Sequence, residues 1–378
     1  FELSFNSYVP GRKFHGVEKL NLNGEHNDVS ILRTRTSNEI LRQAQLPCSR
    51  TSYVKLFINN QYKGLYINVE HMDEEFLQKR FINDDTGNLF KCYYGSDLTY
   101  HGTNASYYQS TYSLKTNETT NDYTGLIHFI NVLNNSTPAN FVCDIQEVLD
   151  VDLYLRTLAV EILISQWDGY AYNKNNYYLY QRPSDGRFVF IEYDLDNTFG
   201  IDWFNINWSN RSIYSWANAN RPLYSKLLAV PYFKDRFNYH MKDLLTNVFI
   251  PSNLIGTLQS TQNMISAAAL ADDYKSLDYG FTDQDFLDAI SQAWGSHVTQ
   301  SLSTYVQNRY TSANSQVLAF QNMLNPCTSG LTELNDIQNI KVVKAYDMLG
   351  REIPLDAKNC LKLITYENGE TKQVYEMD

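Results

Sequence analysis

Four oxygen-bearing side chains flank a short hairpin that the sequence predicts over residues 177–191. Asp168 and Asn173 come before the hairpin, and Asp194 and Asp196 come directly after it. Because a hairpin brings its two ends together, we expect the loop that contains Asp168 to lie beside Asp194 and Asp196. Three carboxylates and an amide oxygen are hard ligands suited to Mg²⁺ or Mn²⁺, and a cation would offset the repulsion between the carboxylates. The spacing therefore predicts a divalent-metal site.

The order of these residues along the chain is that of the catalytic segment of protein kinases. In those enzymes one Asp receives the substrate hydroxyl proton, an Asn after four intervening residues binds a metal ion, and a later Asp bridges the metal ions to the phosphates. Asp168 and Asn173 have this spacing, and the strongly apolar segment 150–167 predicts a buried helix before them. The pattern is also compatible with a structural role, in which Asp168 caps a turn and residues 173–176 form a polar loop.

A motif of a different class overlaps the same residues. Residues 190–198 match the Asp-x-Asp-x-Thr motif of haloacid-dehalogenase phosphatases, in which the first Asp, here Asp194, is the phosphorylated nucleophile. That motif normally opens a parallel α/β domain near the start of the chain, whereas here a hairpin precedes it and mainly helices follow. The phosphatase remains an alternative function.

The bulk composition limits the classes of partner. A formal net charge of −11 argues against nucleic acid as the main partner, because binding a phosphate backbone requires clustered Lys and Arg. A nucleotide is still possible where metal ions offset its phosphates. No stretch approaches the ~20 apolar residues of a membrane helix. The five scattered Cys include no Cys-x-x-Cys pair of the kind that binds zinc or performs redox chemistry.

Strand patterns dominate the first third of the chain. Residues 53–58 and 64–70 alternate with period two and predict a hairpin, and residues 88–94 predict a further strand. The polar stretch 103–122 has no clear period and predicts a loop that links two regions.

Helical patterns occur in two places. Residues 28–47 predict a helix with a capping box from Thr36 to Glu39 and a stop at Pro47. Residues 221–325 predict a series of helices broken at prolines, and short strand patterns follow Pro326. These observations predict three regions: a strand-rich region at 1–120, a mainly helical region at 121–330 and a small β appendage at 331–378.

Read in order, several stretches resemble the CotH family of atypical protein kinases, and together they cover about residues 1–325. The matching stretches are Ile31-Leu32-Arg33, residues 59–70, residues 88–91, residues 168–180 and residues 194–200. Two positions depart from the family pattern, because Asn60 stands where Gly is usual and Tyr193 where Trp is usual.

The resemblance implies an α+β, kinase-like fold of two lobes, the first strand-rich and the second mainly helical. It also implies transfer of phosphate from ATP to Ser or Thr of a protein, with Mg²⁺ or Mn²⁺ as the metal. Matched position by position, Asp168 would be the catalytic residue and Asn173 a metal ligand. Asp194 and Asp196 are both candidates for the main metal-binding Asp, and the spacing does not choose between them.

The resemblance extends to the residues that would bind the nucleotide. Glu70 and Lys91 match an acidic and a basic position of the family, and we expect them to pair over the phosphates. No Gly-x-Gly-x-x-Gly loop is present to cover the phosphates. The basic helix around Arg33, Arg35 and Arg50 would supply that function instead. The missing loop leaves open an alternative, a catalytically inactive family member that acts as a surface binding protein.

Partner and location follow from the same resemblance. We expect a protein substrate with a Ser/Thr-rich segment, no nucleic acid and no membrane span. Residues 346–352 are similar to the last strands of the C-terminal sorting domains of Bacteroidetes secretion, which favours a secreted or cell-surface protein. The chain opens at Phe1 without Met, which is compatible with a removed leader or a shortened chain.

Overall fold

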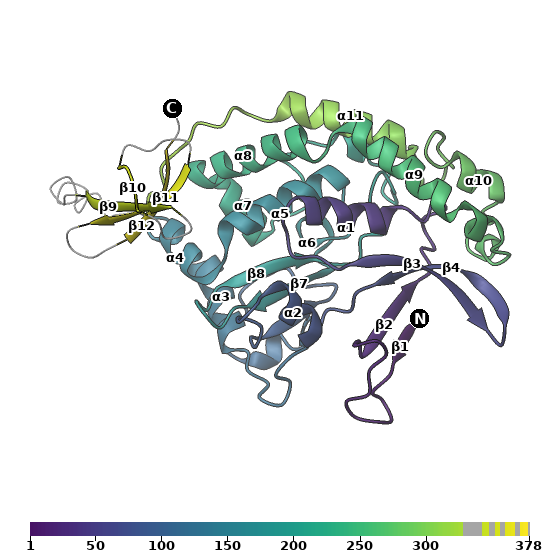
Figure 1. Ribbon diagram of the computed structural model, residues 1–378, viewed down its shortest axis with the longest axis horizontal. Helices are drawn as coiled ribbons and strands as arrows, with labels where there is room; N and C mark the ends of the chain where they lie inside the picture. Colours follow the sequence, from purple (N-terminus) through teal and green to yellow (C-terminus); the bar gives the residue numbers. More distant parts are fainter. Residues whose placement is uncertain (328–341, 348–351, 356–359, 367–370, 377–378) are drawn as a thin grey trace. The chain divides into compact units, whose positions relative to one another are not determined.

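The computed structural model describes residues 1–327, 342–347, 352–355, 360–366 and 371–376 of the chain. Contacts between residues divide the chain into two compact units, Phe1–Leu324 and Asn325–Asp378. The first unit combines helices with two antiparallel sheets, so the α+β fold class predicted from the sequence is confirmed (Figure 1). None of its helices has the length and apolarity needed to cross a bilayer, as far as the described residues go.

The first sheet contains the predicted hairpin. Its strands are β1 (Glu2–Ser4), β2 (Lys19–Asn23), β3 (Thr51–Ile58) and β4 (Gln61–Val69), in the order β1-β2-β4-β3, with every neighbour antiparallel. The turn Asn59-Asn60 has positive φ at both residues, 51° and 62°. Such a turn matches the twist of the two strands, and Asn tolerates this conformation better than most residues do.

The second sheet joins strands that are far apart in the sequence. It contains β5 (Leu89–Cys92), β6 (Tyr112–Leu114), β7 (Tyr177–Gln181) and β8 (Phe188–Glu192), in the order β6-β5-β7-β8. The β7–β8 hairpin is confirmed in antiparallel register. The loop predicted at 103–122 is wrong in part, because β6 forms there by pairing with β5. This sheet therefore combines strands from both sides of the predicted boundary at residue 120.

The helix predicted over 28–47 forms, but the predicted capping box at its start is wrong. Helix α1 spans Arg33–Gln43, and its N-cap residue Leu32 makes no side-chain cap. The Asp28 carboxylate instead accepts hydrogen bonds from the backbone N–H of Leu32 and of Arg33, at 2.9 Å each. Thr36 Oγ1 donates to the carbonyl of Leu32 within the helix. Asp28 satisfies the free N–H groups from outside the helix, so a local capping box is not needed.

Helix α5 (Val151–Ile164) is the buried helix that the sequence predicted before Asp168. Asp150 caps it by accepting from Leu153 N at 3.2 Å, and it packs against α8, β8, α1 and α11. The prolines expected to interrupt the later region stand at the starts of α8 and α9. The remaining helices are α2 (Glu74–Arg80), α3 (Thr124–Asn135), α4 (Phe141–Val148), α6 (Tyr170–Asn173), α7 (Pro222–Ala229), α8 (Pro231–Asn247), α9 (Pro251–Leu270), α10 (Asp283–Asp288) and α11 (Leu302–Gln316).

The second unit contains a four-stranded antiparallel sheet, in agreement with the short strands predicted there. Its strands are β9 (Val342–Asp347), β10 (Glu352–Ile353), β11 (Cys360–Tyr366) and β12 (Thr371–Glu376), in the order β10-β9-β11-β12. Residues 348–351 lie outside the described residues. The similarity of this segment to sorting domains therefore stays a prediction.

Candidate functional site

Asp168 lies in the loop between α5 and α6, where three amide side chains surround its carboxylate. Asn173 Nδ2 donates to Asp168 Oδ1, Asn175 Nδ2 approaches the same oxygen at 3.4 Å, and Asn176 Nδ2 donates to Oδ2 at 2.9 Å. Burial raises the pKa of Asp168 above its ordinary value, and the hydrogen bonds from these donors offset only part of that rise. The carboxylate is thus held in one orientation. Asn173 uses its nitrogen on Asp168, so its amide oxygen remains for another ligand.

The segment after β8, which we call the acidic loop (residues 194–200), lies beside the loop of Asp168. The backbone N–H of Tyr193 donates to the carbonyl of Asn176 at 3.1 Å. Gln166, fully buried just after α5, donates through Nε2 to the carbonyl of Asp194 at 2.7 Å. Asp194 itself has a positive φ of 54°. The hairpin therefore brings its two ends together, as the sequence predicted.

The carboxylates of the acidic loop repel one another and Asp168. Burial, followed by the charge of Asp168, raises the pKa of Asp194, while Lys91 and His26 lower it. Burial and the charges of Asp194 and Asp168 raise the pKa of Asp196 to about 8. A divalent cation beside these groups would remove the repulsion.

The types of donor atom at this site fit a metal ion, although the side chains are not already arranged as a ligand set. Among the described residues, no group of three or more His, Cys, Asp or Glu is already arranged to hold one. The carboxylates of Asp194 and Asp196 and the amide oxygen of Asn173 are oxygen donors of the kind that Mg²⁺ and Mn²⁺ take.

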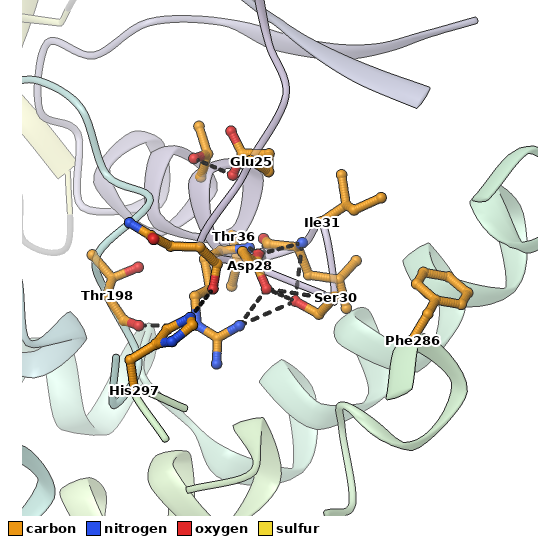
Figure 2. Close-up of polar contacts among 12 residues, drawn as sticks. Glu25, Asp28, Ser30, Ile31, Thr36, Thr198, Phe286 and His297 are labelled. Carbon is orange, nitrogen blue, oxygen red and sulfur yellow. Dashed lines mark hydrogen bonds and ion pairs between the residues drawn. The ribbon is translucent and has the colours of Figure 1, made fainter. Parts of the chain in front are cut away.

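The far end of the acidic loop is anchored to α1 by Arg33. Its side chain is only 1% exposed, forms an ion pair with Asp28, and donates through Nε to the Thr198 carbonyl at 3.0 Å (Figure 2). Thr198 Oγ1 also lies 3.2 Å from Ser37 Oγ. The family resemblance predicts that Arg33 contacts phosphates, but in this structure its guanidinium is buried and holds the acidic loop.

A second anchor comes from the loop before α1. Asn27 Nδ2 donates to Asn197 Oδ1 at 3.1 Å. The Asn27 carbonyl lies 3.1 Å from Nε2 of His297, which Figure 2 labels. Gly200 closes the acidic loop with φ +86°, and a Cβ there would lie 3.1 Å from the Tyr305 ring. Both the backbone conformation and the space therefore require glycine at this position.

Lys91 on β5 faces the start of the acidic loop. Its Nζ lies 4.6 Å from the centroid of the Tyr193 ring. Lys91 also lines a cavity of about 630 Å³, together with Tyr93, Lys115 and Tyr178 among others. The same lining also contains five carboxylates, those of Glu2, Glu18, Asp73, Glu74 and Glu118, so an anionic ligand would meet Lys91 there only together with cations that offset them. The charge of Lys91 does reach the acidic loop, because it lowers the pKa of Asp194.

Glu70 pairs with arginines, and the expected Glu70–Lys91 pair is wrong for this structure. Arg50 Nη2 lies 2.6 Å from Glu70 Oε1, and Arg80 Nη2 lies 2.7 Å from Oε2. Burial raises the pKa of Glu70, but hydrogen bonds from Arg50 and the charge of Arg80 leave it below the ordinary value. The cause is strand pairing, since the Glu70 N–H donates to the Arg50 carbonyl and so places the two side chains together.

Sequence reasoning missed the residues that hold the site in place. Gln166, Asn27 and Asp28 each bond to the acidic loop or to Arg33, yet none belongs to a recognisable motif. Asn175 and Asn176 gave a visible signal, a run of amide side chains after Asp168, which is also compatible with an ordinary polar loop. The strand that leads to Asp194 lies in an antiparallel sheet, unlike the parallel sheet expected for a dehalogenase-type phosphatase.

Comparison with known proteins agrees with this arrangement. The family model described as CotH kinase protein matches residues 1–313. Inner spore coat protein H of Bacillus subtilis is 25% identical over 280 residues, which are 72% of this chain and 74% of that protein. Invasin CotH3 of Rhizopus delemar is 26% identical over 183 residues, which are 46% of this chain and 30% of the invasin. Because the family model spans most of its length, the chain belongs to the CotH family.

Proposed function

We propose that this protein is a protein kinase that depends on ATP and a divalent metal and phosphorylates Ser or Thr of an extracytoplasmic or surface protein. The observation that carries the proposal is the meeting of Asp168 and Asn173 with Asp194 and Asp196, with Lys91 close enough to Asp194 to lower its pKa. Along the chain Lys91 comes first, then Asp168 and Asn173, and then Asp194 and Asp196, an order that suits phosphoryl transfer. The kinase-like division into two lobes is part of the same proposal.

Each residue has a role that follows from its surroundings. Asp168, oriented by its three amide donors, would accept the proton of the substrate hydroxyl. Asp194, Asp196 and the oxygen of Asn173 would hold Mg²⁺ or Mn²⁺, which supplies positive charge that neutralises the phosphates. Lys91 would bind a phosphate oxygen at the edge of the cavity.

The remaining predicted residues position other parts of the site and do not themselves contact the substrate or the metal. Arg33 is a positioning residue, since its guanidinium fixes the acidic loop through Thr198. Arg50 and Glu70 form an ion pair at the paired ends of β3 and β4 and line a further cavity of about 260 Å³. We propose that this ion pair fixes the position of the first sheet relative to the bound nucleotide. We also propose that Lys91 binds the phosphates without forming an ion pair with a carboxylate.

Location and partner are also proposals. The relatives include a spore coat protein and an invasin, which are names of surface proteins. Cys143 is disulfide-bonded, and disulfides persist in oxidising compartments. We therefore propose a secreted or surface-exposed kinase whose substrate is a protein with a Ser/Thr-rich segment.

Calorimetry with ATP, with and without Mn²⁺, tests the proposal. We expect binding with Mn²⁺ and none in EDTA, because the acidic loop would repel a bare triphosphate. Equal affinity in EDTA would contradict metal dependence. If the protein binds Mn–ATP but transfers phosphate neither to a Ser/Thr-rich acceptor nor to itself, the inactive binding protein, which the missing Gly-rich loop favours, becomes the better account.

A further inference from the structure

A third cavity, which we call the arginine pocket, lies on the face formed by α1, the start of β3 and the end of α2. It has a volume of about 420 Å³. Its lining contains four arginines, and its other residues include the polar side chains of Asn38, Ser49 and Thr51. The arginines are Arg35, Arg42, Arg50 and Arg80.

The carboxylates near the pocket do not use up its positive charge. Glu39 pairs with Arg42, and Glu70 pairs with both Arg50 and Arg80. Four guanidinium groups against two carboxylates leave an excess of two positive charges. The whole chain carries −11, so this excess is local and opposes the field of the rest of the protein.

Several guanidinium N–H groups remain available. Arg35 donates through Nη1 to the Thr51 carbonyl at 3.3 Å and lies over the Tyr53 ring; its charge lowers the pKa of Glu39, but it forms no ion pair within 4.0 Å in the described part of the chain. Arg42 uses Nε and Nη2 on Glu39, which leaves Nη1. Guanidinium forks of this kind match the oxygens of a phosphate dianion in both geometry and charge.

The arginine pocket adjoins the acidic loop. Asn38 and Ser49 line the pocket, and they also line the small crevice that contains Asp194. We propose that the arginine pocket binds a phosphoserine or phosphothreonine side chain of a partner peptide and so docks a phosphorylated protein next to the acidic loop. The inference goes beyond the proposed kinase activity and does not require it.

Fluorescence anisotropy with a labelled phosphoserine peptide and its unphosphorylated twin tests the proposal. We expect the phosphopeptide to bind at least tenfold more tightly than its twin, and more weakly at high salt. Arg35→Gln and Arg42→Gln should each weaken binding roughly tenfold, the lower end for losing a hydrogen bond to a charged group.

Arg42 is 66% exposed, so its substitution should not affect folding. The matched control is Arg187→Gln, an exposed arginine paired with Asp185 on the β7–β8 turn, and it should have no effect.

Competition experiments separate the possible sources of the phosphate. Inorganic phosphate should displace the peptide only at far higher concentration; displacement at equal concentration would mean that the pocket takes free phosphate, and the docking proposal would be wrong. If Arg35→Gln and Arg42→Gln weaken Mn–ATP binding and leave the phosphopeptide unaffected, the pocket belongs to the nucleotide. Equal binding of both peptides, or none, also contradicts the proposal. Asp194→Asn should still bind the phosphopeptide, so failure of the kinase proposal and failure of this one are distinguishable.

Discussion

Two pairs of acidic side chains have different surroundings, although Glu192 of one pair stands only two positions before Asp194 of the other. Glu161 on α5 and Glu192 on β8 are 0% and 2% exposed, whereas Asp194 and Asp196 are partly accessible to solvent. Burial raises the pKa of Glu161 to about 8, against the effects of hydrogen bonds from Ala171 and Glu192. Burial and the charge of Glu161 also raise the pKa of Glu192.

The comparison shows that a raised pKa by itself does not identify a reactive group. Asp196 reaches a pKa of about 8 as Glu161 does, and burial is the largest cause in both. The glutamates lie in the core, where burying an uncompensated charge is costly, so burial favours the protonated form of both. Asp196 accepts a hydrogen bond from Asn197 Nδ2 at 2.9 Å, Lys91 lowers the pKa of Asp194, and both aspartates are partly accessible to solvent and so to a cation. Access and partners, and not the pKa shift, separate the structural pair from the proposed site.

Asp168→Asn should give the largest effect. If Asp168 accepts the hydroxyl proton, its loss lowers phosphoryl transfer by about 10²–10⁴-fold while Mn–ATP affinity stays nearly unchanged. Transfer assays on a Ser/Thr-rich acceptor, combined with calorimetry, measure the two quantities separately. A variant that no longer binds Mn–ATP would mean that Asp168 belongs to the metal-binding set.

Asp194→Asn and Asp196→Asn should come next. Each removes charge that the metal requires, so we expect Mn–ATP affinity to fall roughly ten- to a hundred-fold. The larger loss identifies the main metal-binding Asp. Asp185→Asn on the β7–β8 turn makes the same chemical change outside the site and serves as the control. Unchanged affinity in both Asp194→Asn and Asp196→Asn would invert the assignment.

Glu161→Gln tests the structural pair through pH. The folded-state pKa of Glu161 is raised, so the stability from its bound proton is fully present below the ordinary pKa of 4.5 and is lost as the pH rises through about 8. We expect the wild-type Tm to fall between about pH 5 and 9, and to fall less in Glu161→Gln, whose side chain cannot ionise. Circular dichroism melts measure this. Glu147→Gln, an exposed glutamate on α4, should behave as wild type; an identical pH slope in Glu161→Gln would show that Glu161 does not titrate in this range.

A metal-induced shift in Tm should be the smallest effect and the one that separates the pairs directly. A ligand at a hundredfold excess over its Kd stabilises the folded state by about 2.7 kcal/mol, which should appear as a rise of several degrees with Mn²⁺. The rise should persist in Glu161→Gln and shrink to about half or less in Asp194→Asn, as the ten- to hundred-fold loss of affinity requires. The reverse result would place the cation at the glutamate pair.

Local sequence determined the segments that present the site. The buried helix before Asp168, the hairpin that follows it and the position of Asp194 after a buried strand all follow from periodicity and turn residues, because these depend on neighbours within a few positions. The stretches that resemble the CotH family were enough to predict membership of that family, and the order of Asp168, Asn173 and Asp194 led to the kinase hypothesis.

The tertiary structure decided which partner each charged residue takes. The pairing of β3 with β4 places Glu70 beside Arg50, although the sequence suggested Lys91 as its partner. The fold buries Arg33 between Asp28 and Thr198, and Thr198 is 165 positions away in the sequence. The Asp28 carboxylate also replaces the predicted capping box of α1. A long charged side chain has several possible partners in the sequence. Only the folded backbone determines which of these partners lies within hydrogen-bonding distance and is shielded from water.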